Sequence, residues 1–151
     1  MNQDGDTQRR TPEDWEIFDL REAYKDRGPV RYIVGGLIQA QSLSIVYGPP
    51  GTLKSMLMAD LAVCVASGET WLPPTSPEDD GVQKATMRVP VLLCDFDNND
   101  RMTHDRIAAL AYARALQADL PLHYVTMPEP WLAANNNDHI GGLIELIKRL
   151  E

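Results

Sequence analysis

The chain of 151 residues is long enough for one modest domain with a hydrophobic core. With 44% hydrophobic and 24% charged residues, its composition is that of a folded globular protein, which excludes a chain that is disordered throughout. The formal net charge of -8 argues against a segment that grips a nucleic-acid backbone by itself, because such binding requires clustered lysine and arginine.

The sequence carries no recognisable targeting or membrane signal. Residues 1–10 are polar and lack the apolar core of a signal peptide, and the apolar stretches of the chain are too short and too interrupted to span a bilayer. Cys64 and Cys94 lie in apolar runs without metal-ligand or disulfide spacing, so we predict free, buried thiols in a reducing compartment. Together these features predict a cytoplasmic protein without membrane contact.

The first predicted elements in chain order are a tail, a helix and a short strand. Residues 1–10 form the expected tail. The Thr-Pro-Glu-Asp run at residues 11–14 predicts a helix start, with threonine as N-cap and acids in the first turn, and Gly28 marks its end. Residues 31–34 predict a strand, and the glycine pair at residues 35–36 predicts a turn.

The middle of the chain alternates between strand and helix patterns. Residues 43–47 are short, apolar and β-branched, as expected of a buried strand. Residues 55–66 predict a helix that is apolar on more than one face and is ended by Gly68. The prolines, glycines and acids of residues 68–88 predict a long surface loop.

The same alternation continues to the end of the chain. Residues 89–94 predict a second buried strand, residues 101–117 a helix and residues 122–125 a third strand. A turn at residues 135–138 opens a last predicted helix over residues 139–150. Because strands that alternate with helices favour parallel pairing, we expect an α/β sandwich with a parallel sheet. So few strands make a small sheet, and we expect the domain to be incomplete at its C-terminus.

The most informative motif is Gly-Pro-Pro-Gly-Thr-Leu-Lys-Ser at residues 48–55, hereafter the 48–55 loop. A phosphate-binding loop needs converging backbone N–H groups, a helix that begins there, a lysine for the β- and γ-phosphates and a hydroxyl for Mg²⁺. Lys54 and Ser55 follow Gly48 at the required spacing, between a predicted strand and a predicted helix. The residues predicted to bind the nucleotide are Gly48, Pro49, Pro50, Gly51, Thr52, Leu53, Lys54, Ser55 and Met56.

Leu53 departs from the motif, which has glycine at that position. If the backbone there has a positive φ, leucine adds roughly 1–2 kcal/mol of strain, whereas near-helical φ adds little. Because the backbone N–H is present either way, we expect binding to be retained in weaker form. The alternative interpretation of the 48–55 loop is a plain strand–turn–helix connection, for which a Pro-Pro-Gly run is also suitable.

A second acidic site follows the predicted strand at residues 89–94. Asp95 and Asp97 would share one face of a continued strand, near the carboxyl end of the sheet where α/β proteins bind ligands. One acid would orient an attacking water or act as base, and the other would hold Mg²⁺. We expect catalysis from Asp97 and the metal contact from Asp95. The alternative is that these residues only form a turn and cap the next helix.

Three segments resemble RecA-like ATPases of the RepA type, the AAA-family relatives of hexameric replicative helicases. LSIVYGPPGTLKSMLMADLAVCVASGETW resembles their phosphate-loop segment, and the preceding YIVGGLIQAQS their entry strand and turn. VPVLLCDFDNNDRMTHDRIAAL is similar to their second core strand, its acid and the following helix. By this resemblance, which covers roughly residues 30–150, Asp97 takes the place of a catalytic glutamate and Arg106 that of an arginine on the helix.

The resemblance implies an ATP-binding and ATP-hydrolysing, helicase-like motor of a DNA replication or DNA-handling protein. Its cofactor would be Mg²⁺, and its assembly a homo-oligomeric, hexameric ring that contacts DNA through parts of the protein outside this chain. Lys54 would hold the phosphates, Ser55 the Mg²⁺ and Asp97 the water. Asp97 is one methylene shorter than glutamate, which bears on the rate of hydrolysis more than on binding.

The resemblance also implies domain boundaries. Residues 1–28 would form a tail and short helix, and residues 29–151 the N-terminal portion of a RecA-like P-loop ATPase domain. In the family the second acidic strand, Walker B, follows a helix like that predicted at residues 139–150, so this portion would end before it. A competing interpretation makes Asp95 itself the Walker B acid.

Two other functions remain open at this point. A P-loop kinase would use Asp97 to activate an acceptor hydroxyl, with the loop over residues 68–88 as a lid. A sensor module would bind the nucleotide without hydrolysing it. A GTPase is disfavoured, because the sequence offers no Asn-Lys-x-Asp base reader.

Overall fold

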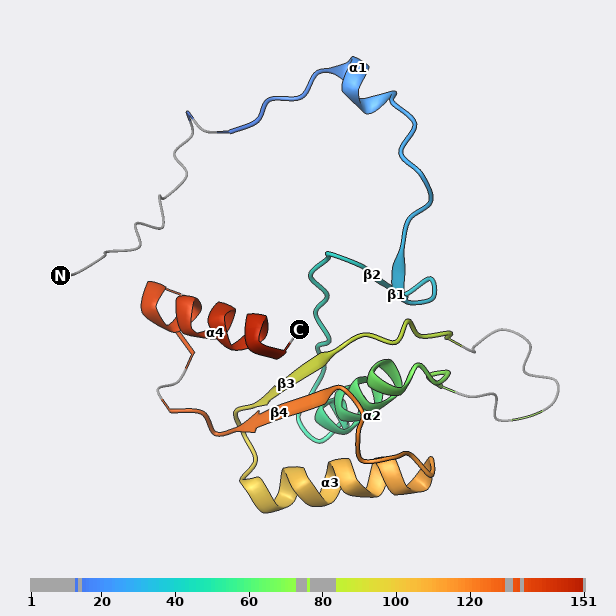
Figure 1. Cartoon of the computed structure of the whole chain (residues 1–151), viewed down its shortest axis with the longest axis vertical. Helices are drawn as coiled ribbons and strands as arrows, with labels where there is room; N and C mark the ends of the chain where they lie inside the picture. The colour runs from blue at the N-terminus through green and yellow to red at the C-terminus, as the bar shows by residue number, and fades with distance from the viewer. Residues whose placement is uncertain are drawn as a thin grey trace.

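Short strands and longer helices alternate along the chain (Figure 1). The structure, a computed structural model, describes residues 13, 15–72, 76, 84–129, 132–133 and 135–150. Its elements are α1 (Leu20–Ala23), β1 (Tyr32–Val34), β2 (Ile38–Gln39), α2 (Lys54–Ser67), β3 (Val91–Asp95), α3 (Asp100–Ala113), β4 (Leu122–Thr126) and α4 (Asn137–Leu150).

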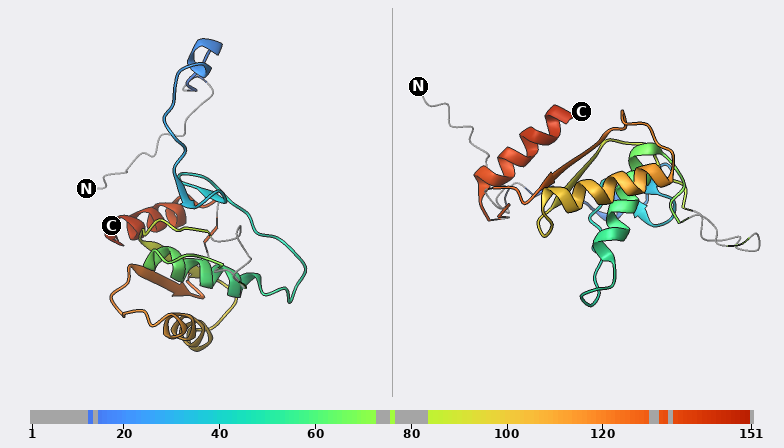
Figure 2. Two further views of the ribbon diagram at one scale, coloured as in Figure 1. Left: turned by 90° about the vertical axis from the view of Figure 1, so that its right-hand side faces the viewer. Right: turned by 90° about the horizontal axis from the view of Figure 1, so that it is seen from below.

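A parallel pair of strands, β3 and β4, forms the centre of the second half of the chain. The two strands pair in register, with Asp95 opposite Thr126 at their carboxyl ends. α2 packs against α3 and against this sheet, and α3 and α4 lie on opposite sides of it (Figures 1 and 2). Thr103 of α3 donates a hydrogen bond to Asp95. On the face of the sheet that α4 covers, Cys94 and Val125 line a cavity together with residues of α4.

The expected α/β architecture is therefore confirmed in its coarse form, with parallel pairing and helices on both faces of the sheet. The sheet is smaller than predicted, because among the described residues it consists of two strands. Cys64 and Cys94 are free thiols. Burial raises the pKa of both thiols, which disfavours the reactive thiolate. Within the described parts of the chain, every helix is too short or too polar to cross a membrane.

A second packing centre joins α2 to the antiparallel β1–β2 hairpin. Where the chain returns toward β3 it runs along β1, with the Gly35 N–H donating to the Ala85 carbonyl and the Met87 N–H to the Ile33 carbonyl, both at 2.8 Å. This core anchors the C-terminal half of α2 and leaves its first turn exposed. The buried residues of the cluster are Val34, Leu61, Cys64, Val65 and Trp71.

Residues 43–47 do not form the predicted buried strand. They have no regular structure, and the side chains of Leu43, Ile45 and Tyr47 are 89%, 77% and 90% exposed. A strand needs a neighbour that donates and accepts backbone hydrogen bonds. Among the described residues β3 and β4 pair with each other, so the segment runs extended into the 48–55 loop, away from the sheet (Figure 2). The apolar, β-branched composition of residues 43–47 indicates a propensity to form a strand, but it does not show whether a neighbouring strand is available to pair with.

The N-terminal helix is also shorter than predicted. The expected N-cap and proline at residues 11–12 lie outside the described residues. α1 is capped instead by Asp19, whose carboxylate accepts a hydrogen bond from the Glu22 N–H at 3.1 Å. A helix without a packing partner is marginal at this length. The large apolar side chains of the predicted helix are all exposed: Trp15, Ile17, Phe18, Leu20 and Tyr24.

The other elements lie within a few residues of their predicted positions. α2 starts one residue early and ends at Gly68, which has a left-handed φ of 80°. β3 starts two residues later than predicted and ends one residue later, at Asp95. α3 ends at Ala113, shortly before the left-handed φ of Ala115. Residues 73–75 and 77–83 of the predicted loop over residues 68–88 lie outside the described residues.

Candidate functional site

The 48–55 loop leads directly into α2 and closes around its own lysine. Lys54 Nζ donates hydrogen bonds to the carbonyl oxygens of Gly48 at 2.9 Å and Pro49 at 2.7 Å. It also lies 3.3 Å from Thr52 Oγ1, which in turn donates to the Pro49 carbonyl at 2.8 Å. These contacts hold a positive charge where the backbone turns into the helix. Nucleotide binding would have to draw Lys54 away from these carbonyl oxygens.

The first turn of α2 is left without a side-chain cap. Leu53 is its N-cap residue, with φ 57° and ψ 20°, and makes no capping hydrogen bond. The start of α3 differs, because there the Asn99 side chain accepts a hydrogen bond from the Met102 N–H at 3.0 Å. The first N–H groups of a helix have no intrahelical acceptor and lie at the positive end of its dipole. The uncapped N-terminus of α2 therefore offers donors suited to an anion.

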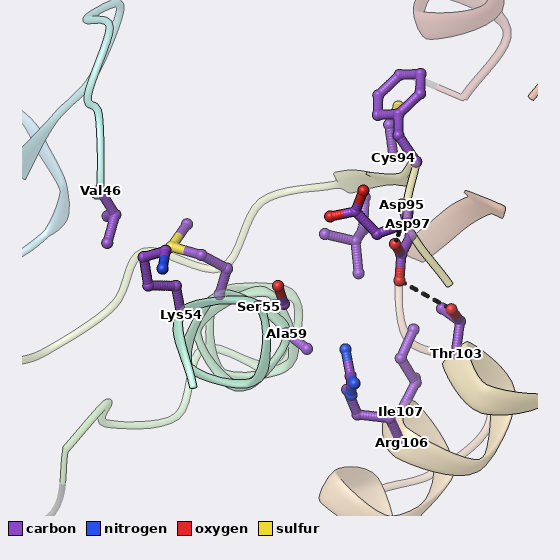
Figure 3. Close-up of a pocket in the computed structure, with 13 residues that line it drawn as sticks. Val46, Lys54, Ser55, Ala59, Cys94, Asp95, Asp97, Thr103, Arg106 and Ile107 are labelled. Atoms are coloured by element: carbon purple, nitrogen blue, oxygen red, sulfur yellow. Dashed lines mark hydrogen bonds between the residues drawn. The ribbon is translucent and has the colours of Figure 1, made fainter. Parts of the chain in front are cut away.

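A cavity of about 320 Å³ lies between the start of α2, the end of β3 and one side of α3 (Figure 3). Lys54 and Ser55 line it from α2, and Asp95 and Asp97 from the end of β3 and the bend that follows. Arg106 points into it from α3 (Figure 3). The structure thus brings together the four residues that the sequence singled out as catalytic or metal-binding, although they come from two separate motifs.

The surroundings of Asp95 are rich in hydrogen-bond donors. Asp95 Oδ1 accepts from the Asp97 N–H at 3.1 Å, from the Asn98 N–H at 3.1 Å and from Asn98 Nδ2 at 3.0 Å. Asp95 Oδ2 accepts from Asn98 Nδ2 at 2.9 Å and from Thr103 Oγ1 at 2.9 Å. Partial burial alone would raise the pKa of Asp95, but the hydrogen bonds from Asn98, the Asp97 N–H and Thr103 together hold that pKa below its usual value.

Asp97 differs from Asp95 in position and contacts. Because β3 ends at Asp95, Asp97 lies in the bend after the strand, so the prediction that both acids share one strand face is wrong. Within the described part of the chain, the exposed Asp97 carboxylate has neither a hydrogen-bond donor nor an ion-pair partner. Figure 3 shows it turned toward the side of the cavity where Ser55 lies, whereas Asp95 is turned toward Thr103. Asp97 is therefore the acid with free acceptor capacity.

Arg106 also lines a second hollow, of about 230 Å³, along residues 51–56. Its guanidinium makes no hydrogen bond or ion pair to another described residue. The sequence identified it by family resemblance, and no spacing argument would have found it. Asn98 was expected only to form a turn, and Thr103 was not singled out at all, because its contact with Asp95 depends on how α3 folds back on β3.

The oxygen donors around the cavity fit a magnesium ion bound partly by substrate. No group of three or more His, Cys, Asp or Glu side chains among the described residues could hold a metal by itself. Mg²⁺ keeps several waters and takes one or two protein oxygens together with phosphate oxygens, so a full protein cage is not needed. The Ser55 hydroxyl and the carboxylates of Asp95 and Asp97 supply oxygens of this kind on one cavity.

Comparison with known proteins gives one finding. The family model described as AAA domain matches residues 9–150. The matched range includes every residue that lines the cavity, among them Lys54 and Ser55 of the 48–55 loop, both acids and Arg106. Searches of curated proteins and of solved structures each gave no match.

Proposed function

The chain belongs to the AAA domain family, and on that premise we propose that it binds ATP with Mg²⁺ at the 48–55 loop and hydrolyses it. AAA ATPase domains generally bind ATP together with Mg²⁺, and membership suggests a nucleotide-binding ATPase. The observation that supports hydrolysis is that Lys54, Ser55 and Asp97 line the same cavity.

Phosphate binding would use the donors already gathered at the start of α2. Lys54 would exchange its hydrogen bonds to the Gly48 and Pro49 carbonyls for charge-assisted bonds to phosphate oxygens. The uncapped N–H groups after Leu53 would donate to the same oxygens. This exchange replaces neutral acceptors with anionic ones, so it favours the bound state.

The Ser55 hydroxyl would hold Mg²⁺, which when bound neutralises charge on the phosphates. Asp95 is the other predicted metal contact. Its carboxylate already accepts hydrogen bonds from Asn98 and Thr103, so a direct bond to the metal would require these to break. The contacts therefore favour Ser55 as the direct ligand.

Hydrolysis would begin from a water held by Asp97. The Asp97 carboxylate would accept a hydrogen bond from this water and orient it toward the γ-phosphorus. The new bond forms to the γ-phosphorus as its bond to the β–γ bridging oxygen breaks, which yields ADP, inorganic phosphate and a proton. Arg106, which points into the same cavity, would face the negative charge on the transferring group.

Two variants test binding and hydrolysis separately. Lys54→Ala should weaken the binding of Mg-ADP in calorimetry and abolish phosphate release. Asp97→Asn should bind Mg-ADP normally and release phosphate at least about a hundredfold more slowly. Lys148→Ala removes an equal charge from α4, where Lys148 pairs with Glu145, and serves as the matched control. Unchanged nucleotide affinity in Lys54→Ala would place the site elsewhere.

We further propose that the ATPase is a RepA-type motor that assembles into a ring and handles DNA. The support is the resemblance of the segments around the 48–55 loop and the acid at Asp97. The net charge of -8 offers little to a DNA backbone, so DNA would act mainly through other parts of the protein. Turnover stimulated by DNA tests this proposal. Turnover that depends on a phosphate acceptor would indicate a kinase instead, and tight binding without turnover a sensor.

A further inference from the structure

We propose that Asp95 is a positioning residue, which through Asn98 and Thr103 fixes the turn that aims Asp97 at the 48–55 loop. The inference rests on the proposed function, in which Asp97 orients the attacking water. It assigns Asp95 a role other than metal binding, and it gives Asn98 and Thr103 a part in the reaction.

The first step is the saturation of the Asp95 carboxylate. A carboxylate offers about four lone-pair sites. The two oxygens of Asp95 receive five contacts at 2.9–3.1 Å, from the Asp97 N–H, from the backbone and side chain of Asn98, and from Thr103. No acceptor position is left for a metal ion or a water without breaking one of these bonds. Asp95 therefore binds its own loop.

The second step is what these bonds fix. Asp95 Oδ1 accepts the N–H groups of both Asp97 and Asn98, so the backbone on either side of the Asp97 side chain is tied to one carboxylate. The direction of the Asp97 side chain follows from that backbone. In Figure 3 the Asp97 carboxylate faces the side of the cavity formed by Ser55, although no described residue donates a hydrogen bond to it or forms an ion pair with it.

The third step is that the turn is anchored to two larger elements. The Asp95 carbonyl accepts the Met127 N–H at 2.8 Å, just beyond β4. Thr103, which donates to Asp95 Oδ2, is only 1% exposed on α3, so its hydroxyl is held in place by packing. The Asp95 carboxylate thus connects α3, through Thr103, to the turn that carries Asp97, so the position of the turn depends on that of α3. Displacing a catalytic group by about 1 Å can slow a reaction about a hundredfold.

The test removes the buried donor and leaves both acids intact. Thr103→Val should lower kcat by about tenfold to a hundredfold, with the Kd for Mg-ADP unchanged. Thr103→Ser keeps the hydroxyl and should restore most of the turnover, which separates a lost hydrogen bond from lost packing. Thr126→Val is the matched control, because the Thr126 hydroxyl donates to Asp100 rather than to Asp95. It should retain kcat within about twofold.

A further readout, the Mg²⁺ dependence of turnover, separates positioning from metal binding. The Mg²⁺ concentration for half-maximal turnover should stay the same in Thr103→Val and in Asp95→Asn. If Asp95→Asn instead needs far more Mg²⁺ and recovers full turnover at saturation, Asp95 is a metal ligand and the inference is wrong.

The remaining outcomes distinguish this inference from the proposed function. Normal turnover in the unaltered protein together with unchanged kcat in Thr103→Val would overturn the positioning role and leave the ATPase proposal standing. Binding of Mg-ATP without any turnover in the unaltered protein would overturn hydrolysis, and with it the positioning role.

Discussion

At the scale of single residues, Leu53 combines strain with exposure. Its φ of 57° is left-handed, which adds roughly 1–2 kcal/mol for a residue with a Cβ atom. Its side chain is 74% exposed, so little packing offsets this strain. The left-handed conformation of Leu53 is required because the backbone turns at this residue from the loop into the first turn of α2. The motif's usual glycine would adopt it without strain.

Replacing Leu53 with glycine should therefore stabilise the protein. Leu53→Gly should raise the free energy of unfolding by about 1 kcal/mol, since the relieved strain exceeds the extra conformational entropy of glycine in the unfolded chain. Urea denaturation measures the change. Leu53→Ala retains the Cβ atom and should give no comparable gain. Equal gains in both variants would mean that the leucine side chain, and not the backbone conformation, is the destabilising feature.

Asp95 makes stability depend on pH in a defined direction. Its pKa lies below the ordinary value of 3.8 in the folded protein because of its hydrogen bonds. A depressed carboxyl pKa stabilises the fold fully above the unfolded value, and this contribution is lost as the pH falls through the folded value. We therefore expect Asp95→Asn to be less stable than the unaltered protein at neutral pH. The difference in stability between the two proteins should shrink as the pH falls below 3.8.

Urea midpoints at about pH 7, 5 and 3 would follow this difference. Asp105→Asn is a suitable control, because Asp105 lies exposed on α3 in a loose 3.8 Å ion pair with Arg101. It should change the midpoint little at any of these pH values. A gap between Asp95→Asn and the unaltered protein that widens in acid would contradict the expected sign.

At the scale of elements, the end of α2 depends on one glycine. Gly68 closes the helix with φ 80°, and its N–H donates to the Cys64 carbonyl at 2.8 Å. A Cβ atom at this position would lie 3.1 Å from Arg88 Cβ, closer than ordinary contact, in addition to the strained backbone. Gly68 therefore fixes both the end of the helix and the approach of the chain that returns to β3.

Gly68→Ala should lower the free energy of unfolding by about 1–2 kcal/mol, measured by urea denaturation. Gly141 in α4 provides the matched comparison, because a Cβ atom there meets nothing within 4 Å and its φ is not left-handed. Gly141→Ala should instead stabilise the protein by up to about 1 kcal/mol, as alanine does inside a helix. A neutral Gly68→Ala would show that the helix end can rearrange.

The elements also show what the sequence could and could not predict. The bounds of α2, α3 and α4 lie close to the predicted ones, because helix caps and helical periodicity are local signals. Gly68 ends α2, and the Asn136 side chain accepts a hydrogen bond from the Asp138 N–H at the start of α4. The strand at residues 43–47 was predicted wrongly, because strand formation depends on a partner that local composition does not reveal.

The candidate site also contains residues that the sequence could predict and residues that it could not. The spacing of the 48–55 loop identified Lys54 and Ser55, and the cavity brings them together with the predicted acids. The contact between Thr103 and Asp95 was not predictable, because it depends on how α3 packs across the end of β3. Motif spacing thus finds residues that a loop presents, and it misses residues that another element holds in place.

At the scale of the whole molecule, two properties oppose each other. Large apolar side chains are exposed before the 48–55 loop, at Leu43, Ile45 and Tyr47. Exposed large apolar side chains that follow one another closely along a segment favour contact with another molecule. The net charge of -8, however, makes copies of the chain repel one another. If copies of the chain assemble as proposed above, apolar contact should drive the association and charge repulsion should limit it.

This balance predicts an unusual salt dependence. Self-association measured by sedimentation velocity should strengthen as salt is added, because salt screens the repulsion and leaves apolar contact intact. Replacing Leu43, Ile45 and Tyr47 with serine should weaken it at every salt concentration. Tyr112→Ser, at a residue 82% exposed on α3, should change it little. Association that weakens with salt would instead show that ion pairs hold the copies together, and the apolar residues before the 48–55 loop would then not be the contact surface.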